Sequence, residues 1–166
     1  MKRVAVYPGT FDPITYGHLD VIRRGRQIFD RLIVVVAVND RKNPLFSVEE
    51  RLDLIRQTTQ GLSGVEVDIC AGLIVDYARK RKASTIIRGL RAVSDFEYEL
   101  QMALMNRELE PKVDTVFLMP SQRHIYLNSG LVKEIARLGG DLKELVPPAV
   151  ARQLKEKFKD GVRRSR

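Results

Sequence analysis

The feature that most constrains the fold is a series of short runs that are rich in valine and isoleucine and mostly apolar on both faces. A strand with one face in water alternates apolar and polar side chains, whereas a strand covered on both faces does not. These runs therefore predict strands buried on both sides of a parallel sheet. They fall at residues 3–7, 32–38, 65–69, 85–87 and 115–119.

Segments with helical spacing or helix boundary signals separate these runs. A capping-box pattern opens one helix at Ser47, and Gly139 and Pro148 mark a helix end and a helix start. The expected helices lie at residues 18–29, from 47 onward, and at 73–82, 94–109, 131–138 and 148–158. Strands that alternate with helices predict an α/β fold: a doubly wound, five-stranded parallel sheet with right-handed crossovers and C-terminal helices.

The length of 166 residues is that of one domain, which we expect over residues 1–158. We expect residues 159–166 to form a basic, flexible tail, because chain ends rich in cations are more often solvated than bound. With a single cysteine, Cys70, the chain cannot form an internal disulfide or a Cys/His zinc cluster.

The longest apolar run has seven residues, from 32 to 38, which is too short to span a bilayer. The first residues contain no pattern of a secretory signal. We therefore expect a cytoplasmic protein with no membrane partner.

The net charge of +8 raises nucleic acid as a partner. Residues 152–166 hold seven cations and two anions, so +5 of this charge lies in the last fifteen residues. The chain also lacks the interleaved basic and aromatic residues of a nucleic-acid stacking platform. We therefore expect no nucleic-acid partner, and a nucleic-acid-binding module stays open as an alternative.

Polar and cationic residues follow the predicted strands at the edge where doubly wound sheets bind ligands. The loop at residues 8–18 is rich in turn residues and contains neither a Gly-x-Gly-x-x-Gly nor a Gly-Lys-Ser/Thr motif, which argues against a nicotinamide dehydrogenase and a P-loop NTPase. Its glycines and the following helix start still predict an anion site, to which His18 adds a hydrogen-bond donor.

Further anion-binding groups follow three other strands. Lys42 follows the second strand, and Arg88 and Arg91 flank Gly89 after the fourth, where two guanidinium groups can grip a phosphate. Residues 120–124 and 128–130 follow the fifth strand and offer small polar side chains and helix-start amides. The alternative is that Lys42 is solvated and that the arginines pair with Asp95 or Glu97.

Four segments resemble a known family. Residues 7–18, YPGTFDPITYGH, resemble the first signature of the nucleotidyltransferase superfamily. Residues 87–99 (IRGLRAVSDFEYE), 117–121 (FLMPS) and 129–134 (SGLVKE) are similar to bacterial phosphopantetheine adenylyltransferases, and the resemblance runs from about residue 3 to about residue 158. The fold that it implies is the Rossmann-like nucleotidyltransferase fold.

The resemblance implies an activity in coenzyme A biosynthesis: transfer of the adenylyl group of ATP to 4′-phosphopantetheine, giving dephospho-coenzyme A and pyrophosphate. It implies Mg²⁺ bound mainly through the ATP phosphates, a homohexamer, and coenzyme A as a feedback ligand. A nucleotidyltransferase that acts on a different phosphorylated acceptor stays open, because it would share the Gly17-His18 loop.

The resemblance also assigns roles to individual residues. His18 would bind the triphosphate and stabilise the transition state, with Lys42 as a second catalytic group. The residues implied for phosphopantetheine are Thr10, Lys42, Ile74 and Arg88. Those implied for ATP are Thr10, Phe11, His18, Gly89, Leu90, Arg91, Glu99, His124, Ile125, Tyr126, Leu127, Asn128, Ser129 and Gly130.

One segment departs from the family pattern. Asn128 and Gly130 stand where the family usually has hydroxyl side chains. We therefore expect backbone amides at this helix start to cradle the phosphates.

The chemistry needs no protein nucleophile, because the phosphate oxygen of the acceptor is already anionic. We therefore expect a direct in-line attack on the α-phosphorus without a covalent intermediate.

The predicted helix at 94–109 has apolar residues on two faces. Such a helix is buried on both faces, either deep in the core or against another subunit. The resemblance favours the oligomer.

Overall fold

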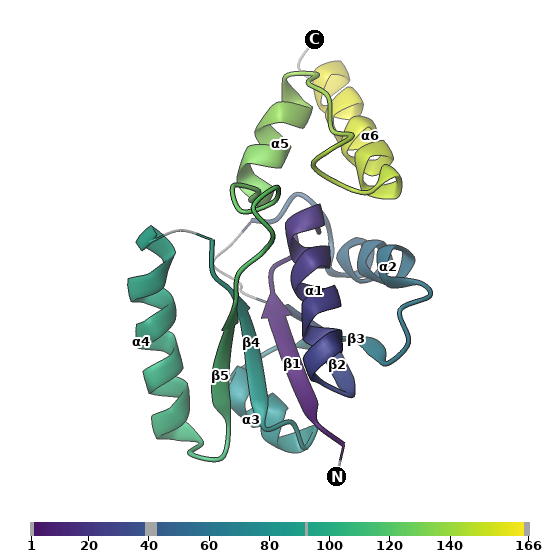
Figure 1. Ribbon diagram of the computed structural model, residues 1–166. Coiled ribbons are helices and arrows are strands. Elements are labelled where there is room, and N and C mark those ends of the chain that lie inside the picture. The colour runs from purple at the N-terminus through teal and green to yellow at the C-terminus, as the bar shows by residue number, and fades with distance from the viewer. Residues whose placement is uncertain (1, 39–42, 92, 165–166) are drawn as a thin grey trace.

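The computed structural model describes residues 2–38, 43–91 and 93–164 (Figure 1). Its strands are β1 (Val4–Gly9), β2 (Arg31–Ala37), β3 (Val65–Cys70), β4 (Thr85–Gly89) and β5 (Asp114–Leu118). They form one five-stranded sheet in the order β3-β2-β1-β4-β5, and every neighbouring pair is parallel. The predicted doubly wound α/β sheet is therefore confirmed. The strand order reverses between β1 and β4.

The helices are α1 (Tyr16–Ile28), α2 (Val48–Thr59), α3 (Ile74–Lys80), α4 (Val93–Leu109), α5 (Ser129–Arg137) and α6 (Pro148–Arg164). Several boundaries differ from the predicted ones, most of them by one or two residues. Helix α5 begins two residues earlier, because the Asn128 side chain caps it by accepting the Leu131 N–H at 2.8 Å. Helix α6 continues six residues past its predicted end at 158, through a segment that contains no proline to stop it.

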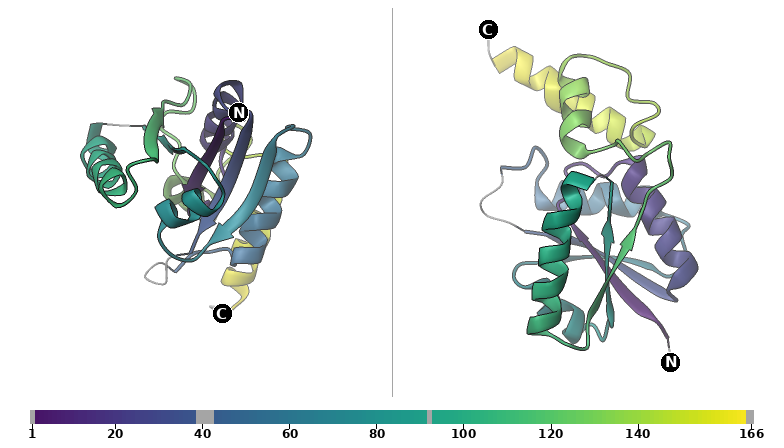
Figure 2. Two further views of the ribbon diagram at one scale, coloured as in Figure 1. Left: turned by 90° about the horizontal axis from the view of Figure 1, so that it is seen from below. Right: turned by 60° about the vertical axis from the view of Figure 1, so that its left-hand side comes forward.

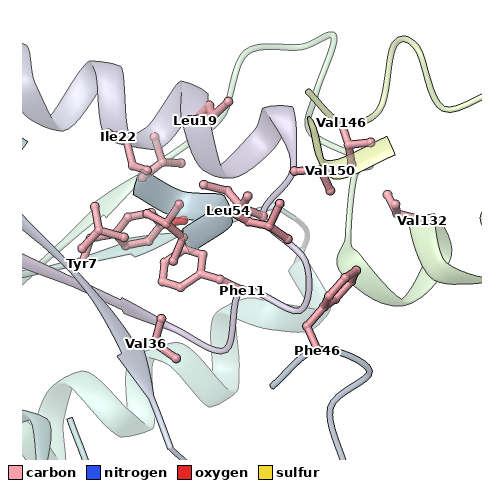
Figure 3. Packing of buried hydrophobic residues seen from close by; sticks show 14 of the residues in the cluster. Tyr7, Phe11, Leu19, Ile22, Val36, Phe46, Leu54, Val132, Val146 and Val150 are labelled. Atoms are coloured by element: carbon pink, nitrogen blue, oxygen red, sulfur yellow. The ribbon is translucent and has the colours of Figure 1, made fainter. Parts of the chain in front are cut away.

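The two faces of the sheet are covered by separate apolar clusters. Ala5 and Tyr7 of β1 pack with side chains from α1 and α2, while Val4 and Val6 pack on the other face with α3. This alternation explains why the strands are apolar on both faces. In Figure 3, side chains of β1, β2, α1 and α2 meet those of α5 and α6 in the first cluster.

Helices α5 and α6 lie beyond the carboxyl ends of β1, β4 and β5 (Figure 1). Val132 of α5 and Val150 and Leu154 of α6 are fully buried in the cluster that also contains Leu54 of α2. This packing fixes the start of α5 above the carboxyl edge of the sheet, where the candidate site lies.

Helix α4 stands apart from the other helices, beside the edge strand β5 (Figure 2). Phe96 of α4 packs against Phe117 of β5 with ring centroids 6.4 Å apart. Many apolar side chains of this helix are nevertheless exposed, namely Phe96, Tyr98, Leu100, Met102, Leu104, Met105 and Leu109. Glu99, on the same helix, is buried.

Candidate active site

A cavity of about 540 Å³ opens at the carboxyl ends of β1 and β4. The strand order reverses at this place, which is where doubly wound sheets bind ligands. The walls of the cavity come from the β1–α1 loop, the segment before α2, the end of β4, helix α4 and the start of α5.

Most of the residues that the sequence predicted for the site meet in this cavity. Those that line it are Thr10, Phe11, His18, Arg88, Gly89, Arg91, Glu99, Leu127, Asn128, Ser129 and Gly130. Five predicted residues do not line it: Ile74, Leu90, His124, Ile125 and Tyr126. Lys42 lies outside the described residues.

The β1–α1 loop is built around the buried ring of Phe11. This ring makes edge contacts with Tyr7 and His18, at centroid distances of 5.4 and 5.1 Å. Phe11 has a φ of +48°, a left-handed conformation that non-glycine residues seldom adopt outside functional sites. A Cβ atom at Gly9 would lie 2.9 Å from the Phe11 ring, so glycine allows the close approach.

A buried arginine supports the same loop from α2. The Arg51 guanidinium donates to the backbone oxygen of Thr10 at 2.9 Å and to that of Ser47 at 3.2 Å. Arg51 thus joins the loop to the start of α2 and serves as a structural cation.

His18 is held by the start of its own helix. Thr15 caps α1, and its backbone N–H donates to His18 Nδ1 at 3.0 Å. An acceptor role for Nδ1 places the proton of a neutral imidazole on Nε2. Burial, with added repulsion from Arg91 and Arg88, lowers the pKa of His18 to about 4. At neutral pH this side chain is therefore an uncharged hydrogen-bond donor.

Arg88 forms a two-pronged ion pair with the buried carboxylate of Glu99. Its Nε and Nη2 donate to the two carboxylate oxygens at 2.7 and 2.5 Å, and its Nη1 donates to the Pro8 oxygen at 2.9 Å. Burial opposes the charge, but the hydrogen bonds and charge of Glu99 outweigh it and raise the pKa of Arg88. The partner of Arg88 among the described side chains is thus Glu99 and not Glu97, while the Asp95 side chain lies outside the described ones.

At the start of α5, the side chains of Asn128 and Ser129 make structural hydrogen bonds, and backbone amides face the cavity. The Asn128 side chain caps the helix, and the Ser129 hydroxyl donates to the Pro13 oxygen at 2.8 Å. The first amides of a helix have no partner within the helix, so those of Ser129 and Gly130 can bind an anion. The Arg91 guanidinium lies beside this turn and donates to the Leu127 oxygen at 3.3 Å.

Sequence reasoning missed a second ion pair in the cavity. The Lys133 ammonium lies 2.6 Å from a carboxylate oxygen of Asp12. Asp12 stands in the predicted anion loop, and Lys133 lies one helical turn after Ser129, so both were near predicted groups. No local pattern connects Asp12 with Lys133, because the two residues are 121 positions apart in the sequence and meet only in the folded chain.

The described part of the chain contains no group of three or more His, Cys, Asp or Glu side chains that could hold a metal ion. Within the same ranges, no helix has both the length and the apolar character needed to cross a membrane.

Two solved structures share this fold at low sequence identity. A structure of a bifunctional NMN adenylyltransferase/ADP ribose pyrophosphatase from Francisella tularensis, complexed with AMP and a manganese ion, matches with a TM-score of 0.71 and 18% identity. The match covers 96% of this chain and 52% of that chain, so this chain spans about half of its length. A structure from Vibrio parahaemolyticus matches with a TM-score of 0.69 and 17% identity over 95% of both chains.

Sequence similarity defines the family more narrowly. The cytidylyltransferase-like family model matches residues 6–135. The phosphopantetheine adenylyltransferase of Caldanaerobacter subterraneus subsp. tengcongensis is 59% identical over 157 residues, which cover 95% of this chain and 98% of that protein. The chain therefore belongs to the cytidylyltransferase-like nucleotidyltransferases and, among them, to the phosphopantetheine adenylyltransferase family.

Proposed function

We propose that this chain transfers the adenylyl group of ATP to 4′-phosphopantetheine, which gives dephospho-coenzyme A and pyrophosphate, a step of coenzyme A biosynthesis. The observation that carries the proposal is that two kinds of phosphate-binding element share one cavity. Arg88, in β4, and Arg91, just after it, supply guanidinium groups, and the start of α5 supplies its first backbone amides. Such a cavity suits a reaction between two phosphorylated substrates.

The mechanism is a single displacement. An oxygen of the acceptor phosphate attacks the α-phosphorus of ATP, and the bond from that phosphorus to the bridging oxygen of the β-phosphate breaks. The electron pair leaves on pyrophosphate. Because the attacking oxygen is already anionic, the protein has to align the two phosphates and stabilise the charge that moves to the leaving group.

His18 fits the second task. Its Nδ1 is occupied by the Thr15 N–H, so Nε2–H is the donor that can face the α-phosphoryl oxygens. A fixed donor aimed at developing charge stabilises the transition state more than the ground state. The low pKa of His18 favours its neutral form, in which Nε2–H is available as a donor.

The two substrates divide the cavity. We assign the phosphate of phosphopantetheine to Arg88, Thr10 and Lys42, with its pantetheine arm toward the backbone near Ile74. We assign ATP to Thr10, Phe11, His18, Gly89, Arg91, Glu99, Leu127, Asn128, Ser129 and Gly130 of the cavity. We also assign to ATP four residues that do not line the cavity, namely Leu90, His124, Ile125 and Tyr126. Within this set, the Glu99 carboxylate also fixes the orientation of Arg88.

ATP enters as its magnesium complex. The carboxylates that line the cavity, Asp12 and Glu99, already pair with Lys133 and Arg88. The metal is therefore carried mainly by the phosphates of the nucleotide and by water, as Mg²⁺ commonly is.

The reaction is tested by incubating the chain with magnesium ATP and 4′-phosphopantetheine and measuring pyrophosphate release and dephospho-coenzyme A by mass. We expect wild-type turnover that needs both substrates. In His18→Ala we expect kcat to fall by about 100-fold or more, because one transition-state donor is lost. The absence of dephospho-coenzyme A, or adenylyl transfer to a different phosphorylated acceptor in its place, would reject the proposed function. Near-wild-type turnover in His18→Ala would reject only the role of His18.

Replacing Arg88 tests the division of substrates. Arg88→Ala should raise the KM for phosphopantetheine about 10-fold or more, and more than the KM for ATP, because a charge-assisted contact is lost. The variant is made in a Glu99→Gln background as well, so that no buried carboxylate is left unpaired. Arg3→Ala, which removes an arginine paired with Asp30 at the opposite end of the sheet, is the matched control. A larger effect on ATP would move Arg88 to the nucleotide.

We further propose that α4 is an interface between copies of this chain, and that the assembly is a hexamer. The support for the interface is the exposed apolar surface of α4, a helix that packs on the edge strand β5 and stands apart from the other helices (Figure 2). Exposed apolar surface of this extent on a soluble domain marks a contact surface. The number six comes from the resemblance of the sequence to its family.

The oligomeric state is tested by measuring the mass of the protein in solution by light scattering. We expect a mass of six times 19.0 kDa for wild type and a smaller species for the double variant Leu104→Glu/Met105→Glu, which places charges on the exposed face of α4. Leu138→Glu changes an exposed leucine outside α4 and should keep the wild-type mass. A monomeric wild type, or an unchanged mass in the α4 variant, would overturn the interface.

A further inference from the structure

The carboxylate of Asp12 is almost fully buried, with 4% of the residue exposed, and both of its oxygens accept hydrogen bonds. Oδ1 accepts the Phe46 N–H at 2.9 Å. Oδ2 accepts the Leu45 N–H at 3.0 Å and the Lys133 ammonium at 2.6 Å. A buried charge is tolerated only with such compensation, so these three contacts fix the carboxylate firmly.

These contacts join three segments that are distant in sequence. Asp12 is in the β1–α1 loop, Leu45 and Phe46 precede α2, and Lys133 belongs to α5. Each segment contributes to the cavity: Asp12 and Lys133 line it themselves, and Asn43 and Pro44 line it just before Leu45. Asp12 therefore sets where three walls of the cavity stand relative to one another.

The ammonium of Lys133 is the part of this arrangement that can act on a substrate. Lys133 is four residues after Ser129, and residues at this spacing lie on one face of a helix. Its side chain thus rises from the helix face that begins at the phosphate-binding amides. A lysine ammonium has three N–H groups on a flexible stem, so one can bond Asp12 while the other two face the cavity.

We propose that Asp12 is a positioning residue for adenylyl transfer, acting through Lys133: it holds the ammonium where it stabilises the pyrophosphate group as that group departs. The inference rests on the proposed function. Charge accumulates on the leaving pyrophosphate, and a cation contributes most when it is already in place before the reaction. Without its ion pair to Asp12, the flexible four-carbon side chain of Lys133 would not hold the ammonium in one place.

The substitution Asp12→Asn changes the charge and hydrogen bonds of the side chain while it keeps the size of the side chain. An asparagine has the same shape, but it replaces one oxygen acceptor with an amide donor. Whichever way the amide turns, a donor then faces the Lys133 ammonium and the Leu45 N–H, or the Phe46 N–H. In both orientations the ammonium loses the negative charge that holds it, and in the first it also loses its hydrogen-bond acceptor, without a cavity being created.

The experiment measures kcat, both KM values and urea unfolding for wild type, Asp12→Asn, Lys133→Met and the double variant. Lys157→Met is the matched control, because it removes a lysine that pairs with Glu50 at 2.7 Å and does not line the cavity. The double variant has neither charge, so it stays folded even if Lys133→Met leaves Asp12 unpaired. Calorimetric titration with inorganic pyrophosphate is run on the same proteins.

We expect kcat to fall about 10- to 100-fold in Asp12→Asn and in Lys133→Met, while the KM for phosphopantetheine changes less than about threefold. The double variant should be no more than about threefold worse than Lys133→Met, because Asp12 acts through that residue. Pyrophosphate affinity should weaken about 10-fold or more in all three, and Lys157→Met should match wild type.

Two results would overturn the inference. A folded Asp12→Asn variant with wild-type kcat and pyrophosphate affinity would show that Asp12 positions nothing. Losses that multiply in the double variant would show that it does not act through Lys133. If wild type makes no dephospho-coenzyme A, the proposed function fails, and the pyrophosphate titration still decides whether Asp12 and Lys133 act together on a phosphate ligand.

Discussion

Burial of β1 on both faces is the constraint from which the rest of the structure follows. Val4 and Val6 are covered on one side and Ala5 and Tyr7 on the other, so the chain must supply helices to both faces of the sheet. Right-handed crossovers then place β2 and β3 on one side of β1, and β4 and β5 on the other. Because the order reverses between β1 and β4, the loops that follow these two strands diverge and leave room for a ligand.

The cavity formed there is lined by donors whose positions are fixed by neighbouring acceptors. Glu99 holds Arg88, Asp12 holds Lys133, and Thr15 fixes the tautomer of His18. The two ion pairs offset the desolvation penalty of placing charged groups where they are partly buried. The result is a site that can stabilise moving negative charge with groups that need little rearrangement, which is what phosphoryl transfer requires.

The sequence predicted the sheet because two-sided burial leaves a local signature, and all five apolar runs are strands. The expected two-sided burial was wrong for β3 and β5, whose residues are mostly half-buried. His18 was predicted from its position at a strand's carboxyl end. Its capping-box bond to Thr15 was not, because the usual capping box has Glu or Gln where this chain has histidine. The pairing of Arg88 with Glu99 was missed because Asp95 and Glu97 were equally plausible from spacing. The Asp12–Lys133 pair depends on tertiary packing between distant segments.

The central claim of the mechanism is a single in-line displacement at the α-phosphorus of ATP, without a covalent intermediate on the protein. The most direct measurement uses an ATP analogue in which sulfur makes the α-phosphorus chiral, with 4′-phosphopantetheine as the acceptor. One displacement inverts the configuration at that phosphorus, so the dephospho-coenzyme A analogue should form with inversion. Retention of configuration would require two displacements through a covalent adenylyl intermediate and would contradict the mechanism.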